Sequence, residues 1–165
     1  MRTEDTFLVQ GGRTLAGAVT PSGNKNEALP VLSACLLTGG AVSLANVPLI
    51  GDVLVMADIL RGMGVRVDAD GGDPHAWTVN AEAVTGDEMD PRLFRRLRAA
   101  ITLAGPLLHR CGKVTIPIPG GDKIGKRRID THLLALQQLG AEVFEEANAY
   151  LLRARHGLHG ADILL

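Results

Sequence analysis

The residues best suited to chemistry are cations that stand beside glycines at expected helix starts. In PSGNKNEALP (21–30), a Gly turn precedes Lys25 and Asn26 where a helix is expected to begin. Free backbone N–H groups, the positive end of the helix dipole and an ammonium group would converge there, which is the outline of a phosphate site. The stretch is not a Walker loop, and Lys25 as an ordinary surface residue is an equal alternative.

A second stretch, IPIPGGDKIGKRRIDTH (116–132), places one acid, Asp122, among four bases between an expected strand and an expected helix. Its three glycines permit backbone angles forbidden to other residues, so the loop could fold closely over a ligand or move as a lid. Arg127 and Arg128 could fork onto phosphate or carboxylate oxygens. A solvated loop without a ligand is the alternative.

The cations gather in one part of the chain. Residues 92–128 carry 10 basic side chains and 1 acidic one, whereas residues 1–91 carry 5 basic and 12 acidic ones. Such a block suits a small polyanion, or else a solvated helix face and loop. A protein that binds nucleic acid would usually be basic overall, and this chain has a net charge of −1 and only 3% aromatic residues. Nucleic acid is therefore not an expected partner.

Export, membrane insertion and metal binding find no support in the sequence. No stretch approaches 18 uninterrupted apolar residues, and the first residues lack the apolar region of a signal peptide. Cys35 and Cys111 have no partners at metal-ligand spacing, so each is expected to be a reduced thiol in the core or a turn. We expect a cytoplasmic protein.

Alternating extended and helical segments are expected to position these residues. Val-, Leu- and Ile-rich stretches bounded by Gly, Pro or Asn predict strands at 6–10, 15–20, 41–47, 64–69, 76–80, 112–117, 141–145 and 149–154. Helices are predicted at 25–38, 52–63, 91–110 and 127–139. Asp52 and Asp90 are expected to cap the second and third of these helices, and Pro91 suits a first helical position.

The pattern of elements repeats. LRGMGVRV (60–67) matches LQQLGAEV (136–143), and LLTGGAVSL (36–44) matches LHRCGKVTI (108–116). Each copy reads strand, helix, strand, helix, strand, strand, which predicts an α+β fold of repeated βαβαββ units.

A third copy is expected to open near the end of the sequence. LHGADIL (158–164) resembles LAGAVTP (15–21), the opening strand of the first copy. An opening strand without its helix would expose an apolar edge, which indicates a fragment of a longer protein. A two-repeat domain with one added edge strand is the alternative.

Three motifs carry a resemblance to a known family. SGNKNEALP, LRAAITLAGPLL (97–108) and PGGDKIGKRRIDTH, together with the repeat, resemble the UDP-N-acetylglucosamine enolpyruvyl transferases (1-carboxyvinyltransferases). The resemblance runs over essentially the whole chain. It implies transfer of the enolpyruvyl group of phosphoenolpyruvate to the 3-hydroxyl of UDP-N-acetylglucosamine, with release of phosphate. The resemblance implies neither a metal nor an organic cofactor. This reaction opens peptidoglycan synthesis, and so serves cell wall biogenesis, cell shape and the cell cycle.

The family fold is of the inside-out barrel type, with two domains of three units each, helices inside, sheets outside and the active site between the domains. By this resemblance, residues 1–20 are opening strands that belong partly to the opposite domain, and residues 21–165 are an incomplete domain. Its repeat units run over about 15–80 and 81–157, and a third starts at 158. The remainder of the polypeptide or a complementary chain would supply the second wall of the site, so this chain alone is expected to be inactive.

The resemblance also implies roles for individual residues. Lys25 and Asn26 would contact phosphoenolpyruvate, Lys25 as a catalytic group, and Arg98 would reach the substrates from its helix. The segment that grips the uridine nucleotide would be Arg127, Arg128, Ile129, Asp130 and Thr131.

Two positions depart from the family pattern. The family usually has Cys where this sequence has Asp122, and Pro where it has Arg128. The Cys donates a proton to the enolpyruvyl methylene carbon and is alkylated by fosfomycin, and some members carry Asp instead. Asp122 is thus the expected general acid, although neighbouring cations oppose its protonation and loop closure would have to desolvate it. Because a carboxylate is a poorer nucleophile than a thiolate, resistance to fosfomycin is expected.

Other functions remain open at this point. The acceptor could be another nucleotide or shikimate 3-phosphate, although the shikimate branch usually has a Ser-rich run after the first Lys that NKNEALP lacks. The chain could also be a non-catalytic domain that binds a nucleotide or another anion. RNA phosphate cyclases share the general architecture but need a catalytic His, and the candidates are interpreted mostly as surface or turn residues: His109, His132, His156 and His159.

Overall fold

The computed structural model describes residues 6–85, 89–118 and 129–164. The helices are α1 (Lys25–Ala34), α2 (Gly51–Gly62), α3 (Pro91–Phe94), α4 (Ala104–Cys111) and α5 (Asp130–Gln138), with 3-10 helices η1 (Cys35–Leu37) and η2 (Arg98–Leu103). The strands are β1 (Ala41–Leu44), β2 (Arg66–Ala69), β3 (Trp77–Asn80), β4 (Lys113–Pro117), β5 (Glu142–Glu145) and β6 (Ala149–Arg153). The six strands predicted from residue 41 onward are all present.

Two three-stranded antiparallel sheets share one topology. Their strand orders are β1-β3-β2 and β4-β6-β5, so the last strand of each unit lies in the middle of its sheet. Asn80 of β3 is opposite both Ala41 and Arg66, in the same way as Arg153 of β6 is opposite Lys113 and Glu142. The predicted α+β repeat is therefore confirmed as two units of helix, strand, helix, strand, strand.

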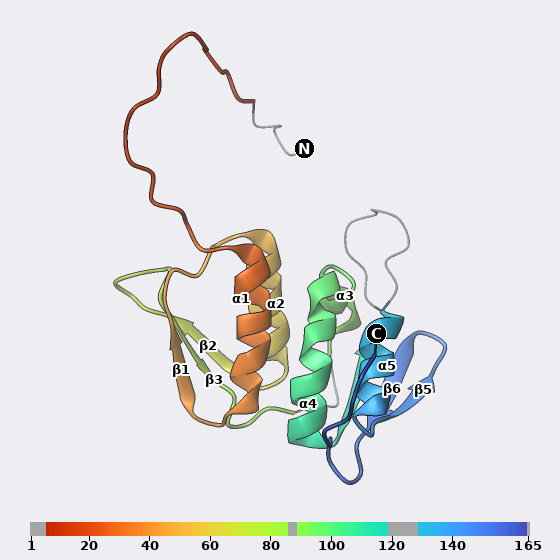
Figure 1. Cartoon of the computed structure of the whole chain (residues 1–165). Helices are drawn as coiled ribbons and strands as arrows, with labels where there is room; N and C mark the ends of the chain where they lie inside the picture. The colour runs from red at the N-terminus through yellow and green to blue at the C-terminus, as the bar shows by residue number, and fades with distance from the viewer. Residues whose placement is uncertain (1–5, 86–88, 119–128, 165) are drawn as a thin grey trace.

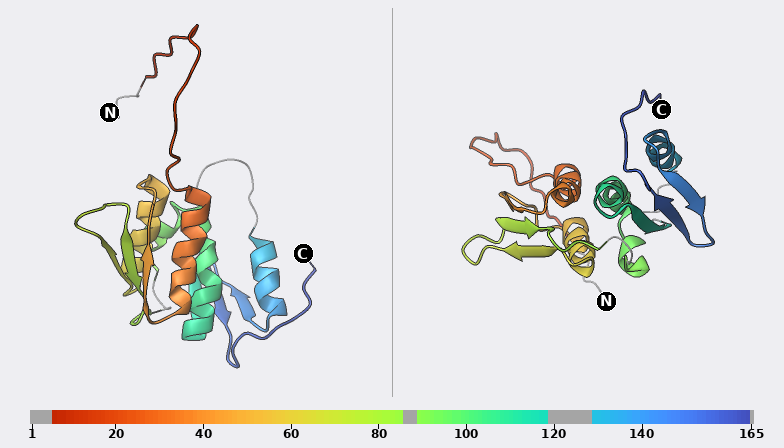
Figure 2. Two further views of the ribbon diagram at one scale, coloured as in Figure 1. Left: turned by 60° about the vertical axis from the view of Figure 1, so that its left-hand side comes forward. Right: turned by 90° about the horizontal axis from the view of Figure 1, so that it is seen from below.

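The two sheets lie on opposite sides of the molecule, and α1, α2 and α4 lie between them (Figures 1 and 2). With so few aromatic residues, the core is filled mainly by aliphatic side chains, as the composition predicts. Its largest fully buried members include Phe94, Leu32, Leu36, Met56, Leu60, Leu103, Leu107 and Leu108. This arrangement, with helices inside and sheets outside, is the one expected for the inside-out barrel type.

A glycine ends the second helix of each unit for the same physical reason. Gly64 and Gly140 have φ values of 83° and 97°, which a side chain would strain. A Cβ on Gly64 would lie 2.8 Å from the carbonyl oxygen of Ala83, and a Cβ on Gly140 would strike the ring of His159. In both units the chain that leaves the sheet therefore passes directly over the glycine.

The strands predicted at 6–10 and 15–20 do not form. Residues 6–24 have no assigned strand or helix, and most of this segment extends away from the body of the molecule (Figure 2). Phe7 and Leu8 are 90% and 98% exposed. A strand needs a neighbour to take its backbone hydrogen bonds, and the described residues offer this segment none. The opening strand expected at 158–164 is likewise not assigned.

The helix predicted over 91–110 is broken into α3, η2 and α4. Asp90 caps α3 as predicted, because its Oδ1 accepts a hydrogen bond from the Arg92 N–H at 2.8 Å. Leu97 is extended, with φ −134° and ψ 102°, and so separates α3 from η2. In a continuous helix the ring of Pro106 would clash with the carbonyl of Thr102, and the 3-10 turn that precedes α4 avoids this clash.

Arg110 of the cationic block has a structural role. Its guanidinium donates to the carbonyl oxygens of Leu36 at 2.7 Å and Ala81 at 3.1 Å, and so ties the second unit to the first. We expect Arg110→Ala to lower the free energy of unfolding by about 1–3 kcal/mol, because both carbonyls lose a charged donor. Urea unfolding followed by the fluorescence of buried Trp77 measures this. Arg92→Ala, at an exposed position, is the control. If both substitutions lowered the free energy of unfolding equally, the structural role of Arg110 would be contradicted.

Candidate anion-binding site

One pocket gathers cations at the end of the molecule where the long helices begin. Helices α1, α2, α4 and α5 run in the same direction, with their N-termini at the upper end of Figure 1. The pocket has a volume of about 310 Å³. Its polar lining residues are Lys25, Asn26, Asp52, Arg96, Arg98, Thr102 and His132. Cationic side chains and the N-terminal ends of helices are thus concentrated around one space.

The start of α1 is fixed by local hydrogen bonds. The side chain of Asn24 accepts from the Asn26 N–H at 2.7 Å, which caps the helix. The Gly23 N–H donates to Asn46 Oδ1 at 3.1 Å, and a Cβ on Gly23 would strike the Asn46 carbonyl oxygen. Glycine is therefore required at this turn, which sets where Lys25 enters the helix.

Lys25 and Asp52 form an ion pair inside the pocket. The distance from Lys25 Nζ to Asp52 Oδ2 is 2.8 Å. The prediction that Asp52 caps α2 is wrong, since Ile50 occupies the N-cap position without a side-chain cap and Asp52 lies in the first helical turn. A cap must turn back to its own helix, whereas this carboxylate extends to the neighbouring helix.

A pair of hydroxyl groups links the two units next to the pocket, which Thr102 lines. The hydroxyl oxygens of Ser33 in α1 and Thr102 in η2 are 2.6 Å apart, and that of Thr102 donates to the Ala99 carbonyl. This bond joins α1 of the first unit to η2 of the second, the elements that carry Lys25 and Arg98. The cations, which are 73 residues apart in the sequence, are thereby kept at one site.

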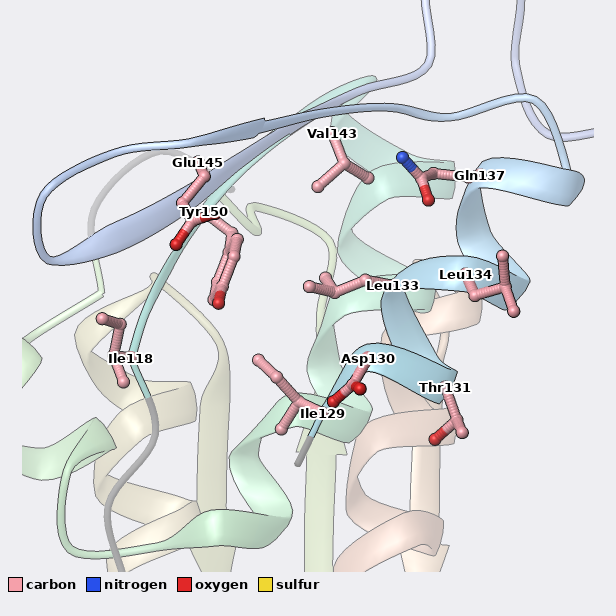
Figure 3. Close-up of a pocket in the computed structure, with 10 residues that line it drawn as sticks. All are labelled: Ile118, Ile129, Asp130, Thr131, Leu133, Leu134, Gln137, Val143, Glu145 and Tyr150. Carbon is pink, nitrogen blue, oxygen red and sulfur yellow. The ribbon is translucent and has the colours of Figure 1, made fainter. Parts of the chain in front are cut away.

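The start of α5 lies between this pocket and a second one of about 830 Å³ (Figure 3). His132 lines the first pocket, whereas Asp130 and Thr131 line the second together with Ile129. In Figure 3 the side chains of α5 face those of β5 and β6 across a mainly apolar space. The carboxylates that line it, Asp130 and Glu145, would repel phosphate. The smaller pocket is therefore the better anion site.

The structure brings together only some of the predicted site residues. Lys25, Asn26 and Arg98 share the cationic pocket, and Ile129, Asp130 and Thr131 share the larger one. Three predicted residues lie outside the described ranges: Asp122, Arg127 and Arg128.

Three residues that line the cationic pocket are not among the site residues predicted from the sequence. The interpretation of His132 as a surface or turn residue misses its place in the pocket, although it directly follows the Ile129–Thr131 segment, which is a signal for the site. Arg96 precedes Arg98 by two residues, so its proximity to a predicted site residue is a similar signal. Asp52 is 27 residues from Lys25, and no local pattern predicts their contact.

Other chemical features of the described part of the chain are few. No group of three or more His, Cys, Asp or Glu residues in these ranges is placed to hold a metal ion. Cys35 is a buried free thiol, and burial raises its pKa, which keeps it protonated and unreactive. Among the described residues, no helix combines the length and the apolarity needed to cross a bilayer.

Comparison with known proteins gives consistent matches. The family model for EPSP synthase (3-phosphoshikimate 1-carboxyvinyltransferase) matches residues 9–163. The UDP-N-acetylglucosamine 1-carboxyvinyltransferase of Bradyrhizobium diazoefficiens is 45% identical over 165 residues, which cover 96% of this chain and 36% of that protein. The UDP-N-acetylglucosamine 1-carboxyvinyltransferase 1 of Symbiobacterium thermophilum is 40% identical over 167 residues, covering 100% and 38%. The chain thus spans little more than a third of the length of these relatives.

A solved structure matches the fold. The enolpyruvyl transferase NikO from Streptomyces tendae superimposes with a TM-score of 0.74 at 24% sequence identity, over 90% of this chain and 32% of that one. The arrangement of two repeated units with sheets outside is therefore found in a larger protein as well.

Proposed function

Because the chain belongs to the EPSP synthase family, we propose that it forms one wall of the active site of an enolpyruvyl transferase. The reaction moves the enolpyruvyl group of phosphoenolpyruvate to the 3-hydroxyl of UDP-N-acetylglucosamine and releases phosphate. Relatives with 45% and 40% identity carry the name of this transferase, which supports the choice of acceptor. The reaction would begin peptidoglycan synthesis in the cytoplasm.

One observation carries the proposal: Lys25, Asn26 and Arg98 meet in a single pocket at the helix N-termini. Phosphoenolpyruvate carries a phosphate and a carboxylate, and both need hydrogen-bond donors and positive charge. Lys25 would bind the phosphate group and stabilise the negative charge that this group gains as it leaves. Asn26 would donate a hydrogen bond to an adjacent oxygen of the phosphate. Donors fixed before the reaction stabilise a developing anion without reorganisation, which is the largest catalytic effect in many enzymes.

The remaining roles fall on the loop and on the start of α5. Asp122 would protonate the methylene carbon of phosphoenolpyruvate, and the complete enzyme would resist fosfomycin because it offers a carboxylate in place of a thiolate. The uridine nucleotide would lie along Arg127, Arg128, Ile129, Asp130 and Thr131. Arg128 stands where the family usually has Pro, so it would give the nucleotide phosphates an additional cation.

The second wall would come from outside this chain. We propose that residues 1–20 pair with strands of an opposite domain, which explains the exposure of Phe7 and Leu8. Residues 21–165 would then form an incomplete domain with units at about 15–80 and 81–157 and a third beginning at 158. Closure of the two walls would exclude water from the reacting groups.

The test is a turnover assay with the full-length protein. Phosphoenolpyruvate and UDP-N-acetylglucosamine are mixed with it, and phosphate release and product mass are followed. We expect an enolpyruvyl ether of the UDP-sugar. Parallel reactions with shikimate 3-phosphate and with a nucleotide without a sugar separate the alternative acceptors, and turnover of either of these in preference to the UDP-sugar would overturn the assignment. Binding of both substrates without product would identify a non-catalytic anion-binding domain instead.

A further inference from the structure

A carboxylate stands inside a pocket that otherwise suits an anion. Asp52 and Lys25 line the cationic pocket together with Arg96 and Arg98, and the ion pair of Asp52 with Lys25 is 2.8 Å long. The negative charge of Asp52 repels an incoming phosphate, since Coulomb energy falls only as the inverse of distance. We therefore looked for a favourable effect of Asp52 that outweighs this repulsion.

A contribution of Asp52 to the stability of the fold does not account for its position in the pocket. The side chains of Lys25 and Asp52 are 43% and 42% exposed, and ion pairs as exposed as this contribute little to folding. Asp52 does not cap α2 either, because the helix begins at Gly51 after an N-cap residue that makes no side-chain bond. A favourable interaction with the dipole of α2 would be available to a carboxylate that faced solvent just as well.

The contact of Asp52 with Lys25 indicates that the carboxylate acts on the lysine ammonium. Lys25 has a flexible four-carbon stem whose ammonium samples many rotamers when nothing holds it. It also sits in the first turn of α1, where the helix dipole repels a cation. Asp52 on the neighbouring helix offsets that repulsion and fixes the ammonium at the pocket. An ammonium has three N–H donors, so it can bind a carboxylate and a phosphate oxygen at the same time.

We propose that Asp52 is a positioning residue, which holds the Lys25 ammonium where the phosphate of phosphoenolpyruvate binds. The inference rests on the proposed transferase function. The proposal predicts the direction of the change in anion affinity, because positioning of Lys25 raises this affinity and repulsion by Asp52 lowers it. Removal of a carboxylate that only repels would tighten anion binding, whereas removal of one that positions Lys25 would weaken it.

The experiment compares Asp52→Ala and Asp52→Glu in the full-length protein. We expect Asp52→Ala to raise the KM for phosphoenolpyruvate by about 10- to 100-fold, with a smaller change in kcat and in the KM for the acceptor. Asp52→Glu keeps the charge and should recover most of the loss. Asp58→Ala is the matched control, since Asp58 lies in the same helix, pairs with Arg61 at 3.1 Å and does not line the pocket.

Each outcome decides one question. An unchanged or lowered KM for phosphoenolpyruvate in Asp52→Ala, or an equal effect of Asp58→Ala, overturns the positioning role while wild-type turnover leaves the transferase standing. Absence of turnover in the wild type overturns the proposed function instead. In that case calorimetric titration with inorganic phosphate still tests Asp52: weaker binding in Asp52→Ala supports the role, and equal or tighter binding refutes it.

Discussion

Asp122→Asn is expected to lower kcat of the full-length transferase by about 10²- to 10⁴-fold, which is the usual contribution of a general acid. The amide has nearly the shape of the carboxylic acid but does not deliver a proton to the methylene carbon of phosphoenolpyruvate. Binding of the substrates should change far less, because the cations of the pocket remain. The measurement is steady-state kinetics of phosphate release, combined with a separate determination of substrate binding by calorimetry.

Asp122→Cys provides the matched control. A thiol can also donate a proton, so this variant should retain much of the activity that Asp122→Asn loses. It should also become sensitive to fosfomycin, with time-dependent inactivation and a covalent adduct visible in the intact protein mass. If the wild-type protein were itself inactivated in this way at ordinary doses, or if Asp122→Asn kept full activity, the assignment of Asp122 would be wrong.

Lys25→Met is expected to lower kcat/KM for phosphoenolpyruvate by about 10²- to 10³-fold. The substitution keeps an apolar stem of similar length and removes the charge and the N–H donors. Asp52, which lies 2.8 Å from the lysine ammonium, would then keep its negative charge in the pocket without this partner. Both changes oppose the binding of phosphate, so the loss should appear in KM as well as in kcat.

Lys113→Met is the control for Lys25→Met, because it also removes one positive charge from the protein. Lys113 is an exposed residue at the start of β4 and does not line the pocket. We expect its kinetic constants to stay within about twofold of the wild type, as is usual for surface substitutions away from a site. Equal losses in Lys25→Met and Lys113→Met would show that general electrostatic attraction, rather than the pocket, accounts for the effect of Lys25.

The repeated fold could be predicted from local patterns. Gly64 and Gly140 mark the end of the second helix in both copies, and each requires a left-handed backbone for which glycine is suited. The strands that follow, β2 and β5, each place one Val on the inner side of the sheet and pair with β3 and β6 of their own unit. For these strands, whose partners lie close by in the same unit, sequence-based prediction and structure agree.

Predictions failed where a local pattern found no partner among the described residues or was overridden by packing. The segments at 6–10 and 15–20 have strand composition but no partner among the described residues, so they remain extended and exposed. The segment predicted as one helix over 91–110 is interrupted at Leu97, which is extended and buried, and again before α4, where Pro106 opposes a continuous helix.

The family resemblance alone singled out Arg98. The sequence by itself determined the repeat, the concentration of positive charge and the outline of a phosphate site at Lys25 and Asn26. These follow from residue type and short-range spacing, which a linear chain displays directly. Only the tertiary structure decided that Asp52 and His132 join them in one pocket. It also separated Asp130 and Thr131 into another space. Such contacts depend on how the helix starts of two units pack together, and that packing is set by the whole core rather than by any local pattern.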